Sequence, residues 1–345
     1  MFKNLSRKFS KGLGIDLGST KTMIYQQDRG IVVNESSVVA VNNRTDQILA
    51  VGDEARRMMG KTPPHIIATA PLFHGIISDF EITEKMLKFL MDKVRAGRFS
   101  FSVKPQVVVG IPLDVTEVEK KAVEDVVLSA GAGQVYLVEN IMAAAVGARI
   151  PIQDPSGNMI VNLGGGLTEV AVISLDGIVN WKATRTAGLT LDSDIIKFAR
   201  DEFNLVLGEM VAEDIKRKIG SALELTEPIE MQMRGRDVMS GLPKEFDIND
   251  SQIREAMHKS VQHILDTIKS TLETTPPELV ADIYQKGIIL TGGVAMLKNI
   301  DKFIAQGIEI PVHVADDPQT CTVRGMGVII GDEILLADIV VPSSQ

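Results

Sequence analysis

A glycine turn between two apolar stretches occurs once near the start of this 345-residue chain and again near its middle. The first copy reads G-I-D-L-G-S-T-K over 14–21, and the second reads N-L-G-G-G-L-T over 162–168. Each copy predicts two strands joined by a turn whose glycines, lacking a Cβ, let backbone N–H groups approach an anion closely. Glycine-rich hairpins are common on their own. The pair, however, favours a chain of two halves that both act on the phosphates of a nucleotide.

The residues at these turns are the candidate phosphate ligands. They are Gly18, Ser19, Thr20 and Lys21 in the first copy and Gly164, Gly165 and Gly166 in the second. A polar side chain precedes each turn, Asp16 in one copy and Asn162 in the other, where a metal-bound phosphate would fit. The chain contains neither G-x-x-x-x-G-K-[ST] nor a G-x-G-x-x-G that opens a helix, so neither of those nucleotide motifs applies.

A third strand, over 287–291, runs into Gly292 and Gly293. Glycine backbone at that point suits contact with a flat ring or with an α-phosphate. An ordinary strand-to-helix turn fits the same spacing equally well.

The composition excludes several classes of function. A formal net charge of −9 argues against a broad nucleic-acid surface. Cys321 is the only cysteine, so an intramolecular disulfide is impossible, which fits a reducing cytoplasm. The five histidines show no metal-binding spacing. No apolar run approaches the roughly 18 residues of a membrane-spanning helix.

The first eleven residues predict a short amphipathic helix. Phe2, Leu5 and Phe9 share one helical face, and four lysine and arginine residues add positive charge without any acid. This pattern is typical of a helix that lies in an anionic membrane surface. A frayed basic terminus explains the residues alone equally well, because so short a helix is marginally stable in water.

Strands and helices alternate along the chain, which is the α/β pattern. Besides the two hairpins, strands are expected at 31–33, 37–41, 48–52, 106–111, 135–138 and 287–291, and helices at 53–60, 83–94, 116–130, 143–148, 192–203, 208–220 and 251–273. Pro276 and Pro277 end the last of these helices. No low-complexity linker separates the segments, so the domains are expected to be interwoven.

Longer stretches carry a family resemblance over essentially the whole chain. They read V-G-D-E-A-R-R-M-M-G-K-T-P at 51–63, A-V-I-S-L-D-G-I-V at 171–179, G-E-M-V-A-E-D-I-K at 208–216, R-G-R-D-V-M-S-G-L-P at 234–243, T-T-P-P-E-L-V-A-D-I at 274–283 and D-P-Q-T-C-T-V-R-G-M-G at 317–327. Three glycine motifs in this order resemble the actin-like ATPase superfamily. The longer stretches resemble, within it, the MreB family of bacterial rod-shape filament proteins.

The resemblance implies an actin-like ATPase fold, with two duplicated lobes and four subdomains around a nucleotide cleft. The core of the first lobe is expected at 12–39, 75–154 and 325–345, its small subdomain at 40–74, the core of the second lobe at 155–190 and 255–324, its small subdomain at 191–254, and a membrane-binding segment at 1–11.

The resemblance also implies ATP with Mg²⁺ as the ligand. It places Asp16 on the metal side, Glu213 and Lys216 at the nucleoside, and Gly292 and Gly293 beside adenine or the α-phosphate. Without the family, Glu213 and Lys216, which lie one helical turn apart, would indicate a surface salt bridge.

The implied partners are a second copy of the chain in a double protofilament, the inner surface of the cell membrane and the membrane proteins of cell-wall elongation. No nucleic acid is implied. The expected location is the cytoplasm, peripheral on the inner face of the membrane. Family members often carry an N-terminal amphipathic helix, which favours the membrane interpretation of Phe2, Leu5 and Phe9.

The chain departs from the family pattern in the expected active site. Asn162 stands at the aspartate of D-I-G-G-G-T-T-E, and Leu167 stands at the first threonine of that motif. Asn140 stands at the second glutamate of E-E-P-M-A-A-A, the expected water-activating residue, whereas Glu139 is retained. The family's G-G-D reads A-G-L at 187–189, and its T-G-G-G reads T-G-G-V at 291–294.

ATP hydrolysis requires a water in line with the γ-phosphate and a metal ion that neutralises charge. Asn140 can orient a water but cannot take its proton, and orientation suffices in actin, which has glutamine at the matching place. The combined loss of the carboxylates at 140 and 162 is harder to compensate, because general acid–base assistance typically raises a reaction rate by ~10²–10⁴-fold. The hypothesis is a nucleotide-binding protein with slow or negligible hydrolysis. In the alternative, Asp16 and Glu139 compensate and turnover is normal for the family.

Three function classes fit the sequence. The leading one is a membrane-associated cytoskeletal filament that maintains rod shape by organising cell-wall synthesis. The second is a plasmid-segregating actin-like filament, which should lack the basic amphipathic N-terminus. The third is a metabolic phosphotransferase of the same superfamily, and the loss of acidic site residues argues against it.

Overall fold

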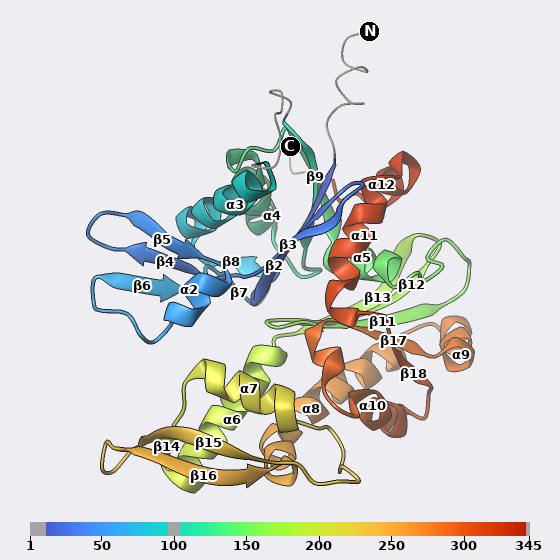
Figure 1. Ribbon diagram of the computed structural model, residues 1–345. Coiled ribbons are helices and arrows are strands. Elements are labelled where there is room, and N and C mark those ends of the chain that lie inside the picture. Colours follow the sequence, from blue (N-terminus) through green and yellow to red (C-terminus); the bar gives the residue numbers. More distant parts are fainter. Residues whose placement is uncertain (1–11, 96–103, 343–345) are drawn as a thin grey trace. The chain divides into compact units, whose positions relative to one another are not determined.

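The structure is a computed structural model that describes residues 12–95 and 104–342 (Figure 1). The predicted membrane residues Phe2, Leu5 and Phe9 lie outside the described residues. The chain divides into two compact units. The first comprises the chain up to Asp154, Leu175–Gly177 and the chain from Thr320, and the second comprises Pro155–Ser174 and Ile178–Gln319. Each unit is therefore assembled from stretches that lie far apart in the sequence.

The first unit is built on a five-stranded sheet with the order β10-β9-β1-β2-β3. β1 (Leu13–Leu17) pairs antiparallel with β2 (Lys21–Gln26), which pairs antiparallel with β3 (Gly30–Ser36). On its other side β1 pairs parallel with β9 (Gln106–Ile111), and β9 pairs parallel with β10 (Gln134–Glu139). The run Val107–Val109 in β9 is completely buried, as expected for a strand covered on both faces.

Helices cover this sheet, and a smaller sheet adjoins it. The helices are α3 (Phe80–Arg95), α4 (Glu117–Ser129), α5 (Asn140–Gly147), α11 (Cys321–Ile329) and α12 (Glu333–Ile339). The smaller sheet has the order β5-β4-β6 and consists of β4 (Val39–Asn42), β5 (Gln47–Val51) and β6 (Ile66–Thr69). Helix α2 (Asp53–Met58) packs on it. A short antiparallel pair, β7 (Leu72–Phe73) and β8 (Ile76–Ile77), follows in the sequence.

Glycines allow α5 and α11 to pack backbone against backbone. A Cβ added to Gly325 would lie 1.7 Å from the carbonyl oxygen of Ala143, and one added to Gly147 would lie 1.9 Å from that of Cys321. Only glycine permits such an approach. Since α11 also contacts β1 and β2, this packing fixes the start of α5 relative to the sheet.

The second unit repeats the sheet of the first. Its strand order is β13-β12-β11-β17-β18, from β11 (Asn158–Leu163), β12 (Thr168–Ser174), β13 (Gly177–Thr184), β17 (Ile288–Thr291) and β18 (Val312–Val314). β11 pairs antiparallel with β12 and parallel with β17, which pairs parallel with β18. The hairpin and its two parallel neighbours thus recur with the same strand directions. The predicted α/β fold and its duplication are confirmed.

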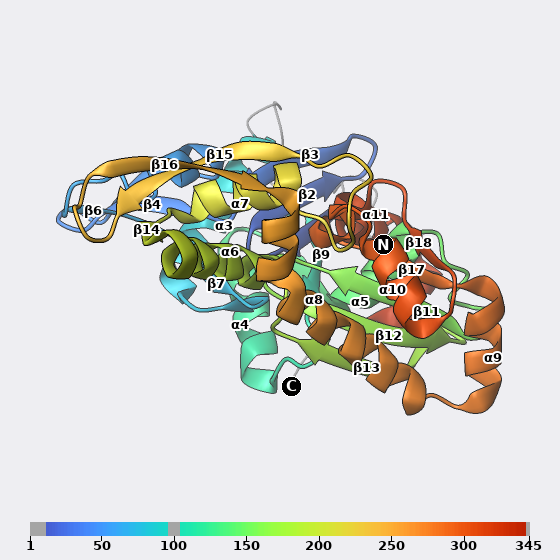
Figure 2. The same cartoon turned by 90° about the horizontal axis from the view of Figure 1, so that it is seen from below.

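The remaining elements of the second unit pack around this sheet. They are α6 (Gly188–Phe203), α7 (Glu209–Ile219), α8 (Asp250–Glu273), α9 (Pro277–Lys286), α10 (Ile300–Ile308), the turn η1 (Gly293–Met296) and a three-stranded sheet of β14 (Leu205–Val206), β15 (Glu230–Asp237) and β16 (Pro243–Asn249). α8 contacts β12 and runs along the larger sheet (Figure 2). Among the described helices, none is long and apolar enough to cross a membrane.

The elements of the second unit that the sequence-based prediction missed include a hairpin and a helix start. The β15–β16 hairpin was not expected because its strands are mostly polar: its buried apolar residues are Met233 and Ile248. Pro276 and Pro277 were expected only to end a helix. Pro277 also begins α9, because proline at the first helical position has no N–H to leave unpaired and already has a helical φ.

Candidate functional site

The first group of predicted site residues lies at one edge of the first sheet. β1, β9 and β10 are mutually parallel, so their carboxyl ends meet at the same edge, where ligands bind in open α/β sheets. Asp16 lies near the end of β1, and Glu139 is the last residue of β10. Asn140 begins α5. The turn from Gly18 to Lys21 follows β1 directly, so the structure brings this predicted group together.

The two glycine turns have the same geometry. Gly18 N–H donates to the carbonyl oxygen of Lys21 at 3.0 Å, and Gly164 N–H donates to that of Leu167 at 3.0 Å. A Cβ added to either glycine would lie 2.7 Å from the carbonyl oxygen that accepts this bond. Each turn therefore closes tightly only because the residue after the strand is glycine.

Hydrogen bonds from neighbouring segments hold the first turn. The hydroxyl of Ser37 donates to Gly18 O at 2.6 Å, and the hydroxyl of Ser19 accepts from Gly75 N–H at 2.7 Å. Within the described residues, the backbone N–H groups of Ser19 and Thr20 donate to no protein group. Two amide donors at a fixed turn fit an anion such as a phosphate. Lys21 donates from Nζ to Asn34 Oδ1 on β3 at 3.0 Å.

The carboxylates at this edge are held in a desolvated place. Burial raises the pKa of Asp16 to about 7. Burial also raises the pKa of Glu139, against the lowering effects of its own backbone hydrogen bond and of Lys120. A buried carboxylate without compensating charge favours either a proton or a cation. The donor set at Asp16 therefore fits a cation that arrives with a ligand.

The raised pKa predicts how the stability of the nucleotide-free protein depends on pH. An aspartate in an unfolded chain has a pKa of about 3.9, so the folded state holds this proton more tightly. The free energy of unfolding should therefore fall as pH rises from about 4 to about 7 and then level off. Between pH 5 and pH 8 the loss due to Asp16 should be about 2–3 kcal/mol.

Urea denaturation of the wild type and of Asp16→Asn at these two pH values measures this effect. The variant should lose less stability than the wild type between pH 5 and pH 8. Asp247→Asn, at an exposed position of β16, is the matched control and should keep the wild-type difference. Equal pH dependence in wild type and Asp16→Asn would contradict the prediction.

Asn140 has a buried oxygen that nothing in the described part of the chain satisfies. Its Oδ1 has no hydrogen-bond partner there. A Cβ added to Gly110 would lie 1.9 Å from this oxygen, so the side chain fits only because β9 has glycine at that point. Buried polar atoms are normally paired. The unpaired oxygen therefore marks a place for a water or a ligand group.

The second group of predicted residues lies at the corresponding edge of the second sheet. Asn162 pairs in register with Glu169 on β12 and with Thr291 on β17. Its Nδ2 lies 3.4 Å from Glu169 Oε2, and its Oδ1 lies 3.4 Å from Thr291 Oγ1. Gly292 follows with φ 85°, where an added Cβ would lie 2.3 Å from Leu163 O. Its backbone thus lies directly against the end of β11.

The first residues of α6 hold the second turn. Gly188 N–H donates to Gly164 O at 3.1 Å, and Leu189 N–H donates to Gly165 O at 2.8 Å. Lys216, on α7, donates from Nζ to Gly188 O at 2.7 Å and forms an ion pair with Asp192 on α6 at 2.8 Å. The Lys216 and Asp192 side chains are 13% and 9% exposed. Lys216 is therefore connected to the glycine turn through the start of α6 rather than lying in an exposed pair.

Glu213 also lies on α7, one turn before Lys216. Asp192, Glu169 and Gly110 were not predicted as site residues. The signal for Glu169 was available, since it is directly opposite Asn162 once the hairpin is assumed. Asp192 and Gly110 reach the site only through pairings between distant segments, for which the sequence carries no local signal.

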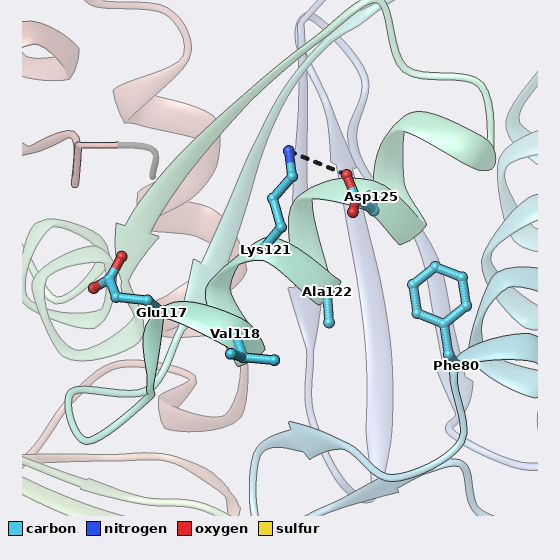
Figure 3. A pocket seen from close by; sticks show the side chains of 6 residues that line it. All are labelled: Phe80, Glu117, Val118, Lys121, Ala122 and Asp125. Atoms are coloured by element: carbon cyan, nitrogen blue, oxygen red, sulfur yellow. Dashed lines mark ion pairs between the residues drawn. The ribbon is translucent and has the colours of Figure 1, made fainter. Parts of the chain in front are cut away.

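Figure 3 shows a hollow in the first unit that none of the predicted site residues lines. It lies between the start of α3 and the first half of α4. Its lining residues are Phe80, Glu117, Val118, Lys121, Ala122 and Asp125. Lys121 and Asp125 form an ion pair at 3.2 Å on α4. Among the described residues, no group of three or more His, Cys, Asp or Glu side chains has the arrangement of a metal site.

Comparisons with known proteins agree over nearly the whole chain. The sequence model of the MreB/Mbl protein family matches residues 10–335. The chain is 43% identical over 323 residues to the cell shape-determining protein Mbl of Bacillus subtilis (strain 168), covering 93% of this chain and 96% of that protein. It is 42% identical over 331 residues to the cell shape-determining protein MreB of Escherichia coli (strain K12), covering 95% of each.

Solved structures match as well. The crystal structure of MreB5 of Spiroplasma citri bound to ADP has a TM-score of 0.90 and 35% identity, covering 96% of this chain and 98% of that one. A MamK double helical filament has a TM-score of 0.79, covering 94% and 99% of the two chains. At 19% identity, that second likeness bears on the actin-like fold alone.

Proposed function

The chain belongs to the MreB/Mbl protein family, and from that premise we propose that it is an actin-like cytoskeletal protein that binds ATP with Mg²⁺ and determines cell shape as a filament. The observation that carries the proposal is the repeated glycine turn, closed by the same hydrogen bond in both units. The relatives in Bacillus subtilis and Escherichia coli bear the name cell shape-determining protein. The MreB5 structures of Spiroplasma citri were solved with ADP and with AMPPNP.

The residues present fit a nucleotide with a metal ion. The amides of Ser19 and Thr20 are available to phosphate oxygens, and Gly164, Gly165 and Gly166 form the second turn. Asp16 would hold Mg²⁺ together with water and phosphate oxygens, since Mg²⁺ usually keeps several waters. The ion would neutralise charge on the phosphates. Glu213 and Lys216 would contact the nucleoside, and Gly292 and Gly293 would lie beside adenine or the α-phosphate.

We propose further that hydrolysis is slow. A general base must be able to accept the proton of the attacking water, and the amide of Asn140 cannot. Its unpaired oxygen can still accept a hydrogen bond from a water and so orient it. The filament would therefore keep nucleotide binding while its turnover is weakened.

A specific observation supports the alternative of a fully active ATPase. Glu139 lies next to Asn140, and its pKa is raised by burial, which brings a carboxyl closer to the range of an effective base at neutral pH. Phosphate release by Glu139→Gln separates the two cases. A large loss relative to wild type would assign the base to Glu139, and an unchanged slow rate would support weakened hydrolysis.

Sedimentation of the full chain with ATP, with ADP and without nucleotide tests the proposed function. Phosphate release is read from the same tubes. We expect polymer with ATP and little released phosphate. Absence of both ATP binding and polymer would contradict the function itself, whereas polymer with phosphate release at the rate of other family members would contradict only the slow hydrolysis.

The proposed partners are further copies of the chain, the inner surface of the cell membrane and the membrane proteins of cell-wall elongation. The proposed location is the cytoplasm, peripheral to that membrane. The N-terminal pattern of Phe2, Leu5 and Phe9 with four basic residues supports the membrane part, because apolar burial and attraction to anionic lipid add to each other.

Co-sedimentation with anionic vesicles should depend on the N-terminal segment. Replacing Phe2, Leu5 and Phe9 by serine is expected to reduce bound protein at least tenfold, because the apolar face is lost while the charge stays. Serine at Asn4 and alanine at Ser6 and Ser10 is the control on the other positions and should leave binding unchanged. Equal binding of both variants would show that the segment does not anchor the protein through its apolar face.

A further inference from the structure

Ser37 contacts the first glycine turn twice. It follows β3 directly, and β3 pairs with β2, the strand that comes after the turn (Figure 1). The backbone N–H of Ser37 donates to Thr20 O at 3.0 Å, and its hydroxyl donates to Gly18 O at 2.6 Å. Ser37 is completely buried. A single residue from outside the turn therefore holds two of its carbonyl groups.

These two hydrogen bonds fix the directions of peptide planes in the turn. A peptide unit is planar and trans, so the N–H that follows a carbonyl group points to the opposite side. The bond to Gly18 O therefore directs the N–H of Ser19 away from Ser37, and the bond to Thr20 O does the same for the N–H of Lys21. Within the described residues, the Ser19 N–H donates to no protein group. Ser37 thus determines where this available amide points.

The duplicated fold shows what is particular to the first turn. Gly164 takes the place of Gly18 in the second turn, and its carbonyl oxygen accepts the N–H of Gly188 at 3.1 Å. That bond comes from the backbone, which any residue except proline provides. In the first turn the corresponding bond comes from a side chain, the hydroxyl of Ser37. The first turn therefore depends on the identity of one residue.

The Thr22 hydroxyl acts on the turn through Ser37. A carbonyl oxygen only accepts, and a hydroxyl has a single hydrogen, so the hydrogen of Ser37 Oγ points to Gly18 O. Thr22 Oγ1 lies 2.9 Å from Ser37 Oγ and must then be the donor of that bond. Thr22 is also completely buried. The orientation of the Ser37 hydroxyl is therefore fixed from both sides.

We propose that Ser37 is a positioning residue for the phosphates of ATP. By holding Gly18 O and Thr20 O, it keeps the Ser19 N–H directed at the anion before ATP arrives, so that binding does not have to order the turn. A site that is ordered in advance binds more tightly, because the cost of ordering it is removed. The inference rests on the proposed nucleotide binding and names the residue that prepares the first turn for phosphate.

The test measures how much the phosphates contribute to binding by the full chain. Adenosine and ATP, each with Mg²⁺, compete with a fluorescent ATP analogue, and the readout is the ratio of the Kd for adenosine to the Kd for ATP. Ser37→Ala removes the bond to Gly18 O and should lower this ratio about tenfold, with the Kd for adenosine changed less than about threefold. A general loss of structure would weaken both ligands and leave the ratio unchanged.

The preceding residue supplies a matched control. Ser36 is a completely buried serine as well, but its hydroxyl donates to Asp53 Oδ1 at 2.6 Å instead of to the turn. In Ser36→Ala the backbone N–H of Ser36 still donates to Asp53 Oδ1, at 3.1 Å. This variant should therefore leave the ratio unchanged.

The Thr22 hydroxyl supplies a second control and protects the fold. Ser37→Ala leaves that buried hydroxyl without its partner, which costs stability. The double variant Thr22→Val with Ser37→Ala removes both hydroxyls, so it is expected to be the more stable of the two, and its ratio should fall as far as in Ser37→Ala. Thr22→Val alone keeps the bond from Ser37 to Gly18 O, and its ratio should stay within about threefold of wild type.

An unchanged ratio in Ser37→Ala or in the double variant would overturn the inference. A fall in Ser36→Ala or Thr22→Val as large as that in Ser37→Ala would overturn it too, because the bond to Gly18 O is kept in both. Failure of the wild type to bind ATP and its fluorescent analogue at all would instead overturn the proposed function.

Discussion

Replacing Asn140 by glutamate is expected to raise the rate of phosphate release about 100-fold. The gain comes from a carboxylate that can accept the proton of the attacking water, an effect typically worth ~10²–10⁴-fold. We expect the lower end of that range because Asn162 is still present. The affinity for ATP should change little, because residue 140 belongs to neither of the two glycine turns that are proposed to bind the phosphates.

Two features of position 140 favour a carboxylate there. Asn140 is the first residue of α5, where a negative side chain interacts favourably with the helix dipole. Its Oδ1 is packed over Gly110 without a partner, so the substitution breaks no hydrogen bond of that oxygen.

Asn140→Gln is the matched control, since glutamine has the length of glutamate but cannot take a proton. Its rate should stay within about threefold of wild type, measured by phosphate release from the same amount of polymer. If the rate rises as much in Asn140→Gln as in Asn140→Glu, the length of the side chain and its orientation of the water limit the rate. Proton transfer to residue 140 would then not be the missing step.

The parts of the fold that were predictable are those with a strong local pattern. Helix α8 was expected at 251–273 and is found at Asp250–Glu273, because its apolar residues recur at helical spacing. The strand at 106–111 coincides with β9, since a continuous apolar run indicates burial on both faces. The two hairpins were predictable because a glycine turn joined apolar stretches in each copy.

What was not predictable depends on contacts between distant segments. The start of α6 holds the second turn through bonds to Gly164 and Gly165, and nothing local to residues 187–189 indicates this. Asp192 became the partner of Lys216 only because α6 and α7 pack together. The residues alone favour a surface salt bridge between Glu213 and Lys216; in the structure Lys216 forms an ion pair with Asp192, and both of those side chains are largely buried. The unpaired oxygen of Asn140 likewise depends on Gly110, a residue of another strand.

Replacing Gly292 by alanine is expected to lower the free energy of unfolding by roughly 3 kcal/mol or more. The backbone there has φ 85° and ψ 169°, a region that side chains rarely adopt and that alone costs of order 1–3 kcal/mol. The new Cβ would also lie 2.3 Å from the carbonyl oxygen of Leu163 and 2.5 Å from its carbon. Both atoms belong to the backbone of β11, where Leu163 pairs with Thr168 on β12 and the preceding residue, Asn162, pairs with Thr291 on β17.

The neighbouring glycine is the control. A Cβ added to Gly293 has Gln319 Nε2, at 3.7 Å, as its nearest neighbour, which is ordinary contact distance, so Gly293→Ala should change stability by less than about 1 kcal/mol. Urea denaturation of the two variants without nucleotide measures the difference. Because a displaced Gly292 also moves the end of β17 away from Asn162, ATP affinity should weaken in Gly292→Ala. Similar losses of stability in both variants would show that the contact between β11 and β17 does not depend on the left-handed backbone conformation of residue 292.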